Sequence, residues 1–507
     1  MSVRKRVRTE TATSWYGKIK SIVGSELFFR LTLLLFVLQA GIIAVVSGFP
    51  LAFDEGFHLG VIQLHATQLS PFFSNLPDST GQFGALVTDP SYLYHYLMSF
   101  PYRLITTITN DTFAIVLFLR FINVALFAAG IVVFRKVLKF TGASNALINL
   151  VLLAFVALPL QTFTAAQINY DNLLFLATAA ALLFCLRFTE KLRTTKQFDT
   201  TNFALTIAAC LFAAQVKYVF MPIFAAIAVF VGFTIAKWVY TDKKKALASI
   251  KTNTLAVSTR MKFVLISLLL ITGGMFAYRF GYNLTKYQAI SPDCSKVLGV
   301  EACMQYGTWA RNYELSQTHT PSTSWAQQKA FVRAWTGITG GQLFTILDGN
   351  RGGITVQPVG QFLIGATIIV IGGFALVLLQ WRKINKIDHA TGLILLVSGA
   401  YLVALISKNY SEYVQYGMPI AMQGRYLLPI LLLLMVLLAQ IYSITLKTKP
   451  VLKLAVLAFI VAVGVQGGGI VTYALRTNDE SWRWTNTALV PTQDLTNVQA
   501  SQAGLKQ

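Results

Sequence analysis

Residues 31–50 read LTLLLFVLQAGIIAVVSGFP, and residues 51–58, directly after them, read LAFDEGFH. The first stretch has no charged residue and matches the length of about 20 residues that a helix needs to span a bilayer. The second places two adjacent carboxylates, Asp54 and Glu55, where that helix would leave the membrane. Charged groups at a bilayer edge are costly unless they are solvated or used, so we treat this point as the candidate active site.

The amino-acid composition is that of a membrane protein. Of the 507 residues, 55% are hydrophobic and 12% are charged, and the mean hydropathy is +0.59. Soluble domains carry about twice that share of charged residues. The apolar residues come in runs of about 20 that are separated by short basic segments, which is typical of membrane-spanning helices. We therefore expect an all-α polytopic membrane protein.

The net charge of +22 would also suit a protein that binds nucleic acid. The basic residues, however, cluster beside the hydrophobic runs and not on a polar domain. A positive bias on the cytoplasmic side of a membrane explains this pattern better, so we expect a lipid bilayer and no nucleic acid as partner. The first apolar run follows the basic residues Arg4, Lys5, Arg6 and Arg8 and is predicted to be an uncleaved signal anchor.

About eleven apolar runs are long enough to be membrane-spanning helices. Their predicted spans are 28–50, 112–134, 146–166, 172–188, 202–216, 218–237, 263–282, 361–381, 390–407, 425–446 and 451–473. The fifth run is short and could form one broken hairpin with the sixth. With a cytoplasmic N-terminus, most of the excess Lys and Arg lies on the cytoplasmic side, as expected for a plasma-membrane protein. The chain then divides into a cytoplasmic N-terminus (1–27), a transmembrane domain (28–473) and an external polar tail (474–507).

Two long segments, 51–111 and 283–360, are predicted to lie outside the membrane. The first holds the acidic pair and an aromatic run at 92–96, which suits an amphipathic helix in the interface with tyrosines at headgroup depth. The second contains Cys294 and Cys303. Because both cysteines face the oxidising side, we expect a disulfide between them, and the alternative is two unpaired thiols.

Asp54 and Glu55 are the candidate catalytic residues. One carboxylate could accept a proton from an acceptor hydroxyl, while its neighbour orients it or helps to hold a divalent cation. The alternative is a solvated pair at a helix end. His58 and His65 share a helical face and could assist, but two histidines with one aspartate do not complete a metal site. We therefore predict no metal ligands, and for His58 we expect a polar contact with the substrate or its surroundings.

Residues 423–429, QGRYLLP, open a late helix and place Arg425 and Tyr426 at its N-terminus. Free backbone N–H groups and the helix dipole favour an anion there, and a guanidinium adds a bidentate contact to phosphate. The alternative is an interfacial arginine that reaches to water. Lys217 and Tyr218 lie between two apolar runs, so Lys217 is either a second cation in the same cavity or a turn lysine.

Arg120 and Asp171 are further candidate binding residues. Arg120 lies about eight residues inside an apolar run, where an arginine needs either an acidic partner on another helix or a wet cavity. Asp171 begins another helix and could simply be a charge that the helix dipole favours. The sequence contains no phosphate-binding GxxxxGK[ST] loop, no GxGxxG fingerprint after a strand and no HExxH motif. The donor of any reaction should therefore be carried in the membrane.

These residues resemble the motifs of the GT-C superfamily of membrane glycosyltransferases, which use polyprenyl-phosphate-linked sugars. In protein O-mannosyltransferases and lipid A aminoarabinose transferases an acidic pair follows the first membrane helix, as Asp54 and Glu55 do here. An uncharacterised bacterial membrane-protein family of the same superfamily is more similar. The matching stretches are FDEGFH (53–58), INYD (168–171), KY (217–218) with Pro222, and QGRY (423–426) with Pro429. One departure is Gly56-Phe57, where related transferases commonly have proline.

The resemblance implies a GT-C-like bundle with outer interfacial helices and an inverting transfer of sugar. The phosphate of a polyprenyl-phosphate donor would bind near Arg425 and Lys217, and Asp54 would deprotonate a hydroxyl of a glycan, lipid or protein acceptor on the outer side. Asp54 and Arg425 must then face the same pocket. A transporter or flippase for a lipid-linked sugar, or a non-catalytic scaffold of an envelope complex, are the alternatives that the sequence leaves open.

Overall fold

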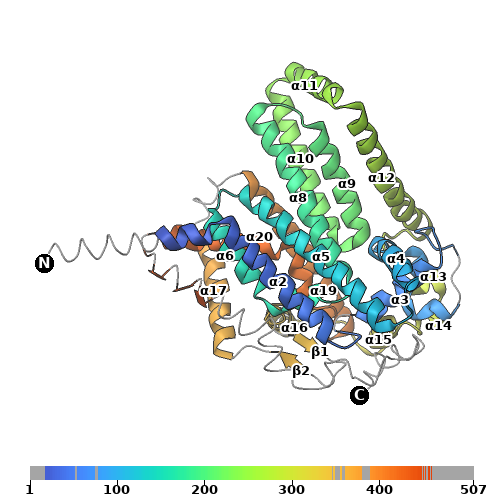
Figure 1. Ribbon diagram of the computed structural model, residues 1–507. Coiled ribbons are helices and arrows are strands. Elements are labelled where there is room, and N and C mark those ends of the chain that lie inside the picture. Colours follow the sequence, from blue (N-terminus) through green and yellow to red (C-terminus); the bar gives the residue numbers. More distant parts are fainter. Residues whose placement is uncertain are drawn as a thin grey trace, which may run out of the picture.

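The computed structural model describes residues 17–51, 54–74, 78–344, 346–348, 354–356, 360–379, 389–447, 449, 451–452, 455–456 and 458–459. This part of the chain is almost entirely helical (Figure 1). Its one sheet is a pair of short antiparallel strands, β1 (Ile346–Asp348) and β2 (Ile354–Val356), in which Leu347 is opposite Thr355.

Seven helical segments in the described residues are long and apolar enough to cross a membrane. They are α2 (Glu26–Val46), α5 (Thr112–Lys139), α8 (Tyr170–Thr195), η3 with α10 (Tyr218–Phe220 and Met221–Thr241), α12 (Thr259–Tyr287), α19 (His389–Tyr416), and η6 with α20 (Gly424–Leu427 and Leu428–Thr445). Each corresponds to one of the spans predicted from sequence. The prediction of a multi-pass helical membrane protein is therefore confirmed.

The other predicted spans differ in detail. The run at 146–166 forms α6 (Asn145–Val156) and α7 (Pro159–Ala165), which meet at 71°. Proline disfavours a helical conformation in the residue before it, and Leu158 is accordingly extended. Two further runs form α9 (Thr200–Val216), which has 17 residues, and α17 (Gly360–Leu379), which has 20.

Most of the predicted run at 451–473, and the predicted tail at 474–507, lie outside the described residues. The described residues thus hold seven candidate spans, or eight if the bent pair of α6 and α7 is one span. They do not establish the number eleven.

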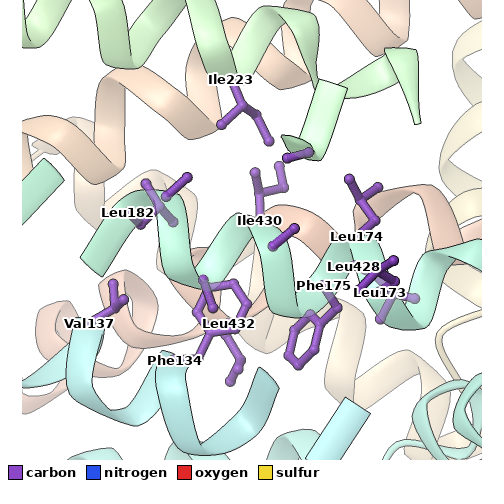
Figure 2. Packing of buried hydrophobic residues seen from close by; sticks show 14 of the residues in the cluster. Phe134, Val137, Leu173, Leu174, Phe175, Leu182, Ile223, Leu428, Ile430 and Leu432 are labelled. Carbon is purple, nitrogen blue, oxygen red and sulfur yellow. The ribbon is translucent and has the colours of Figure 1, made fainter. Parts of the chain in front are cut away.

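Four helices form the centre of the bundle. Figure 2 shows side chains of α5, α8, α10 and α20 packed together, among them Phe175 and Leu432, which are fully buried. Phe127 of α5 stacks on Phe175 of α8 with ring centroids 4.5 Å apart. Gly130 permits this contact, because a Cβ atom there would lie 2.4 Å from Phe175 Cδ1.

The first long segment folds beside the bundle as α3 (Glu55–Ala66), η1 (Asp78–Phe83), η2 (Leu86–Thr88) and α4 (Leu93–Thr106). Two of the tyrosines expected at headgroup depth face the protein and not the lipid. Tyr92 and Tyr94 are buried in the protein, and their hydroxyls donate to Gln215 Oε1 and Asn123 Oδ1 at 2.7 and 2.9 Å. Buried partners on α9 and α5 therefore hold these rings inside the protein.

The second long segment forms the short helices α13 (Cys294–Leu298), α14 (Val300–Cys303), α15 (Gly307–Thr318), α16 (Trp325–Trp335) and η4 (Thr336–Gly340). The predicted disulfide between Cys294 and Cys303 is confirmed and ties α13 to α14. Tyr306, just after α14, packs against Phe57 of α3 with ring centroids 6.0 Å apart. The two long segments thus meet at the same end of the bundle (Figure 1).

Candidate functional site

Asp54 and Arg425 form an ion pair, although 371 positions separate them in the sequence. Arg425 Nη2 donates to Asp54 Oδ2 at 2.9 Å. The Asp54 side chain is 59% exposed and the Arg425 side chain is 1% exposed, so an accessible carboxylate lies on a buried guanidinium. Asp54 begins α3 in the left-handed conformation, with φ at 66°. The structure thus brings together the acid and the cation that the sequence had singled out separately.

The segment around Arg425 is held from two sides. Tyr401 of α19 donates its hydroxyl to the Tyr426 carbonyl oxygen at 2.6 Å. The Gly424 N–H donates to Gln342 Oε1 at 2.8 Å, and a Cβ atom on Gly424 would lie 3.0 Å from the Thr339 carbonyl oxygen. Arg425 Nε donates to Gln423 Oε1. The guanidinium is therefore positioned before any ligand arrives, which lowers the ordering cost of binding an anion.

Lys217 and Asp171 form a second ion pair beside the first. Lys217 Nζ donates to Asp171 Oδ1 at 2.7 Å, and both side chains are buried. Asp171 Oδ2 lies 3.9 Å from Arg425 Nε and accepts no hydrogen bond from the described residues, so Asp171 lies between the two cations. The ring centroids of Tyr170 and Tyr426 are 4.2 and 4.8 Å from Lys217 Nζ. We call Asp54, Asp171, Lys217 and Arg425 the charge cluster.

The charge cluster is electrically balanced, with two carboxylates and two cations. Burial lowers the pKa of Lys217 to about 8, although the nearby Asp171 opposes the shift. An anionic ligand that took the place of one carboxylate would leave the balance unchanged. The cluster is thus suited to exchange a carboxylate for an anionic ligand, since Lys217 and Arg425 could bind either anion.

Glu55 faces away from the charge cluster. Its carboxylate is fully buried and accepts four hydrogen bonds: from Arg120 Nε and Nη2 at 2.8 and 2.7 Å, and from the N–H groups of Leu51 and Ile168 at 2.6 and 3.1 Å. Arg120 also donates to the carbonyl oxygens of Ala44, Ser47 and Gly48 at 2.7–2.9 Å. The pair joins the end of α2, the middle of α5 and the loop before α8.

The two adjacent carboxylates therefore have different surroundings. The four donors around Glu55 occupy its accepting positions, and its side chain has no exposed surface. Asp54 instead presents an exposed carboxylate beside the charge cluster. Within the candidate catalytic pair, this geometry favours Asp54 as the proton acceptor and Glu55 as the residue that positions it.

His58 lies on α3 one turn after Asp54 and contacts His95 of α4. The two ring nitrogens, His58 Nδ1 and His95 Nε2, are 2.9 Å apart, and both rings are buried. The Tyr170 ring meets His58 edge-on, with centroids 4.6 Å apart. Burial holds the pKa of His58 and of His95 well below 6.5, so both rings are neutral in the folded protein. His65 lies apart from this pair, and its ring packs at a tilt against Phe73 with centroids 4.4 Å apart.

This histidine pair predicts a pH-dependent stability. The folded protein keeps both rings neutral, whereas the unfolded chain takes up protons below pH about 6.5. The contribution of these two rings to the free energy of unfolding should be constant above that pH and should fall below it by up to about 1.4 kcal/mol per pH unit for each ring. Thermal unfolding in detergent between pH 8 and 5 measures this. His58→Gln with His95→Gln should flatten the decline, and an unchanged slope would contradict the account.

A buried amide network supports the site and was not foreseen from sequence. Asn123 Oδ1 accepts hydrogen bonds from Tyr94 Oη and Asn172 Nδ2, both at 2.9 Å, and from the Asn169 N–H at 3.4 Å. The Asn169 side chain in turn caps α8 at the Asp171 N–H. The available signal was Asn123, which lies three residues after Arg120 in a run of α5 that is otherwise apolar. Through this network, α4 and α5 fix the start of the helix that carries Asp171.

Some candidate residues lie outside the charge cluster. The Tyr218 side chain is 39% exposed, and its N–H donates to Ser91 Oγ at 3.1 Å. Arg120 belongs to the buried Glu55 pair. Within the described ranges, no three His, Cys, Asp or Glu side chains gather as a set of metal ligands.

No model of a known protein family matches this chain, and no curated protein sequence matches it either. The chemistry of the site therefore has to follow from its own residues.

Proposed function

We propose that this protein is an inverting glycosyltransferase of the GT-C type that moves a sugar from a polyprenyl-phosphate donor to an envelope glycan, lipid or protein. The observation that carries the proposal is the 2.9 Å contact between the exposed carboxylate of Asp54 and the buried guanidinium of Arg425. A carboxylate that could accept a proton is thus in direct contact with a cation that could bind a phosphate.

Arg425 and Lys217 are the proposed phosphate-binding groups. Without a ligand, each is paired with a carboxylate, Asp54 in one case and Asp171 in the other. A donor phosphate would take the place of Asp54 on Arg425, because the two free oxygens of a phosphodiester offer a guanidinium the same paired contact and the same single negative charge as a carboxylate. Asp54 is the partner that can leave, since its side chain is largely exposed whereas Asp171 is buried. Donor binding thereby releases the base.

The proposed reaction then proceeds in one displacement. The released Asp54 carboxylate accepts the proton of the acceptor hydroxyl, and the hydroxyl oxygen forms a bond to the anomeric carbon of the sugar. The bond between that carbon and the phosphate oxygen breaks, and its electron pair leaves with the polyprenyl phosphate. Arg425 and Lys217 stabilise the charge that gathers on the phosphate as this bond breaks. Attack opposite the leaving group inverts the anomeric configuration.

A divalent cation at Asp54 and Glu55 fits these residues poorly. The Glu55 oxygens are all engaged by N–H donors, and Asp54 already faces a guanidinium. Such a cation would have to bind between Asp54 and Arg425 against the charge of the arginine. We therefore assign no step to a metal.

The proposal is tested with the purified protein in lipid, supplied with a panel of polyprenyl-phosphate sugars and with envelope extracts as acceptors. We expect sugar transfer with release of polyprenyl phosphate and an inverted anomeric linkage in the product. Asp89→Asn serves as a control variant, because Asp89 lies in the same long segment but contacts the Ser91 N–H and not the charge cluster. Movement of the intact lipid-linked sugar across the bilayer without transfer would favour the transporter instead.

The proposal also includes the orientation, with the N-terminus cytoplasmic, the charge cluster on the outer side of the plasma membrane, and about eleven spans in the whole chain. Two exposed positions at opposite ends of the bundle test it: Arg311 on α15, and Lys251 on α11 (Lys243–Ala256). A membrane-impermeant maleimide applied to intact cells should label Arg311→Cys and leave Lys251→Cys unlabelled. Labelling of Lys251→Cys alone would reverse the assigned orientation.

A further inference from the structure

A second candidate site lies at the opposite end of the bundle from the charge cluster. It is a pocket of about 370 Å³ between the end of α8, the end of α10 and the start of α19. The charge cluster lies where α8 begins, and this pocket lies where α8 ends, so that Asp171 and Arg193 are 22 residues apart on the same helix. At 1.5 Å per residue the two are about 33 Å apart along the helix, roughly the thickness of the hydrocarbon core of a bilayer.

The lining of the pocket combines cations with aromatic rings. Arg193 comes from the last turn of α8, Lys196 directly follows that helix, and Lys237 comes from α10. None of the three makes an ion pair with any described residue, and the described residues that line the pocket include no acidic side chain. Three cations around one cavity repel each other, so an anion bound between them would be stabilised.

The aromatic part of the lining comes from α10. Phe230, Phe233 and Trp238 recur at helical spacing with Lys237, so one stretch of helix presents both apolar rings and a cation to the cavity. The Phe233 side chain is 69% exposed. Trp238 is held in place by Phe198, with ring centroids 6.2 Å apart. An exposed phenylalanine and a fixed tryptophan at the end of a membrane span suit the boundary between acyl chains and headgroups.

We propose that this pocket binds the phosphate headgroup of an anionic phospholipid in the leaflet opposite the charge cluster. The three cations would contact the phosphate, and the aromatic rings would contact the glycerol and the first part of the acyl chains. Charge complementarity favours this occupant over a zwitterionic lipid, because a zwitterionic headgroup brings its own cation into the pocket. A free inorganic anion would use the basic side chains and leave the aromatic rings without a partner. The inference does not depend on the proposed transferase activity.

The experiment measures phosphatidylglycerol binding to the full chain in a non-ionic detergent by native mass spectrometry. The site variant is Arg193→Gln/Lys196→Asn/Lys237→Gln, in which asparagine suits the left-handed backbone of residue 196, where φ is 58°. The matched control is Lys243→Gln/Lys244→Gln/Lys251→Gln, which removes the same charge from exposed positions of the neighbouring α11. Phosphatidylcholine serves as the zwitterionic comparison, and glycerol 3-phosphate and inorganic phosphate serve as soluble competitors.

We expect the site variant to bind phosphatidylglycerol about a hundredfold more weakly, because each basic residue near an anionic lipid contributes roughly fivefold to affinity. The affinity of the control variant for phosphatidylglycerol should stay within about threefold of the wild-type affinity, because its three lysines do not line the pocket. Three results would each overturn the proposal: equal losses in both variants, equal binding of phosphatidylcholine, or full displacement of the lipid by the soluble phosphates. If the site variant does not fold, Lys196→Asn alone, at an exposed helix end, should still weaken binding about fivefold.

Discussion

Replacing Asp54 by asparagine should reduce sugar transfer by about 10²–10⁴-fold, the usual contribution of a positioned general base. Asparagine keeps the size of the side chain and can still accept a hydrogen bond from Arg425, so the fold should persist. The left-handed backbone of residue 54, where φ is 66°, also favours asparagine over most other residues. The measurement is the turnover rate in lipid at saturating donor.

The control for this prediction is the thermal midpoint of Asp54→Asn, which should equal that of the wild type within a few degrees. A turnover rate near that of the wild type would remove Asp54 from the mechanism. The same midpoint would also distinguish a rate that falls because the base is lost from a rate that falls because the variant is unfolded.

Replacing Arg120 by methionine should destabilise the protein by about 3–5 kcal/mol, because it leaves the buried Glu55 carboxylate without its charged partner. Three carbonyl oxygens at the end of α2 would also lose their donors. The double variant Glu55→Gln/Arg120→Met should be less damaging than the sum of the two single variants, because the two changes remove one shared contact. The free energy of unfolding in mixed micelles measures the loss.

Lys191→Met is the matched control for Arg120→Met. Lys191 pairs with Asp199 at 3.2 Å, but its side chain is 45% exposed, so its removal should cost about 0–1 kcal/mol. If Arg120→Met were as mild as this control, the Glu55–Arg120 pair would not be the structural tie that its seven hydrogen bonds suggest.

Seven of the spans could be predicted from sequence because a bilayer imposes a length and an apolar composition that each of these runs of residues satisfies locally. The cysteine pair could be predicted because its members are only nine positions apart. The break between α6 and α7 is also local, and Pro159 marked it in the sequence. The apolar run at 146–166 was nevertheless predicted as one span, and in the structure it forms two helices that meet at 71°.

The contacts within the site could not be predicted in the same way. Asp171 and Lys217 were each singled out, but 46 residues and a helical hairpin separate them, and only the packing of α8 against α9 brings them together. Asp54 and Glu55 were treated as one pair because they are adjacent. Asp54 has a left-handed backbone and Glu55 is the first residue of α3, however, and the two side chains face a charged cluster in one case and a buried arginine in the other.

In the proposed mechanism a single guanidinium, that of Arg425, pairs with the Asp54 carboxylate before the donor arrives and with the donor phosphate afterwards. The most direct test is the affinity of polyprenyl phosphate for the wild type and for Asp54→Asn, titrated in detergent without acceptor. Asparagine competes less well than a carboxylate for Arg425, so the variant should bind the lipid phosphate several-fold more tightly while transferring almost no sugar. An affinity that is unchanged or lower in the variant would show that Asp54 and the phosphate do not share Arg425, and would contradict the account.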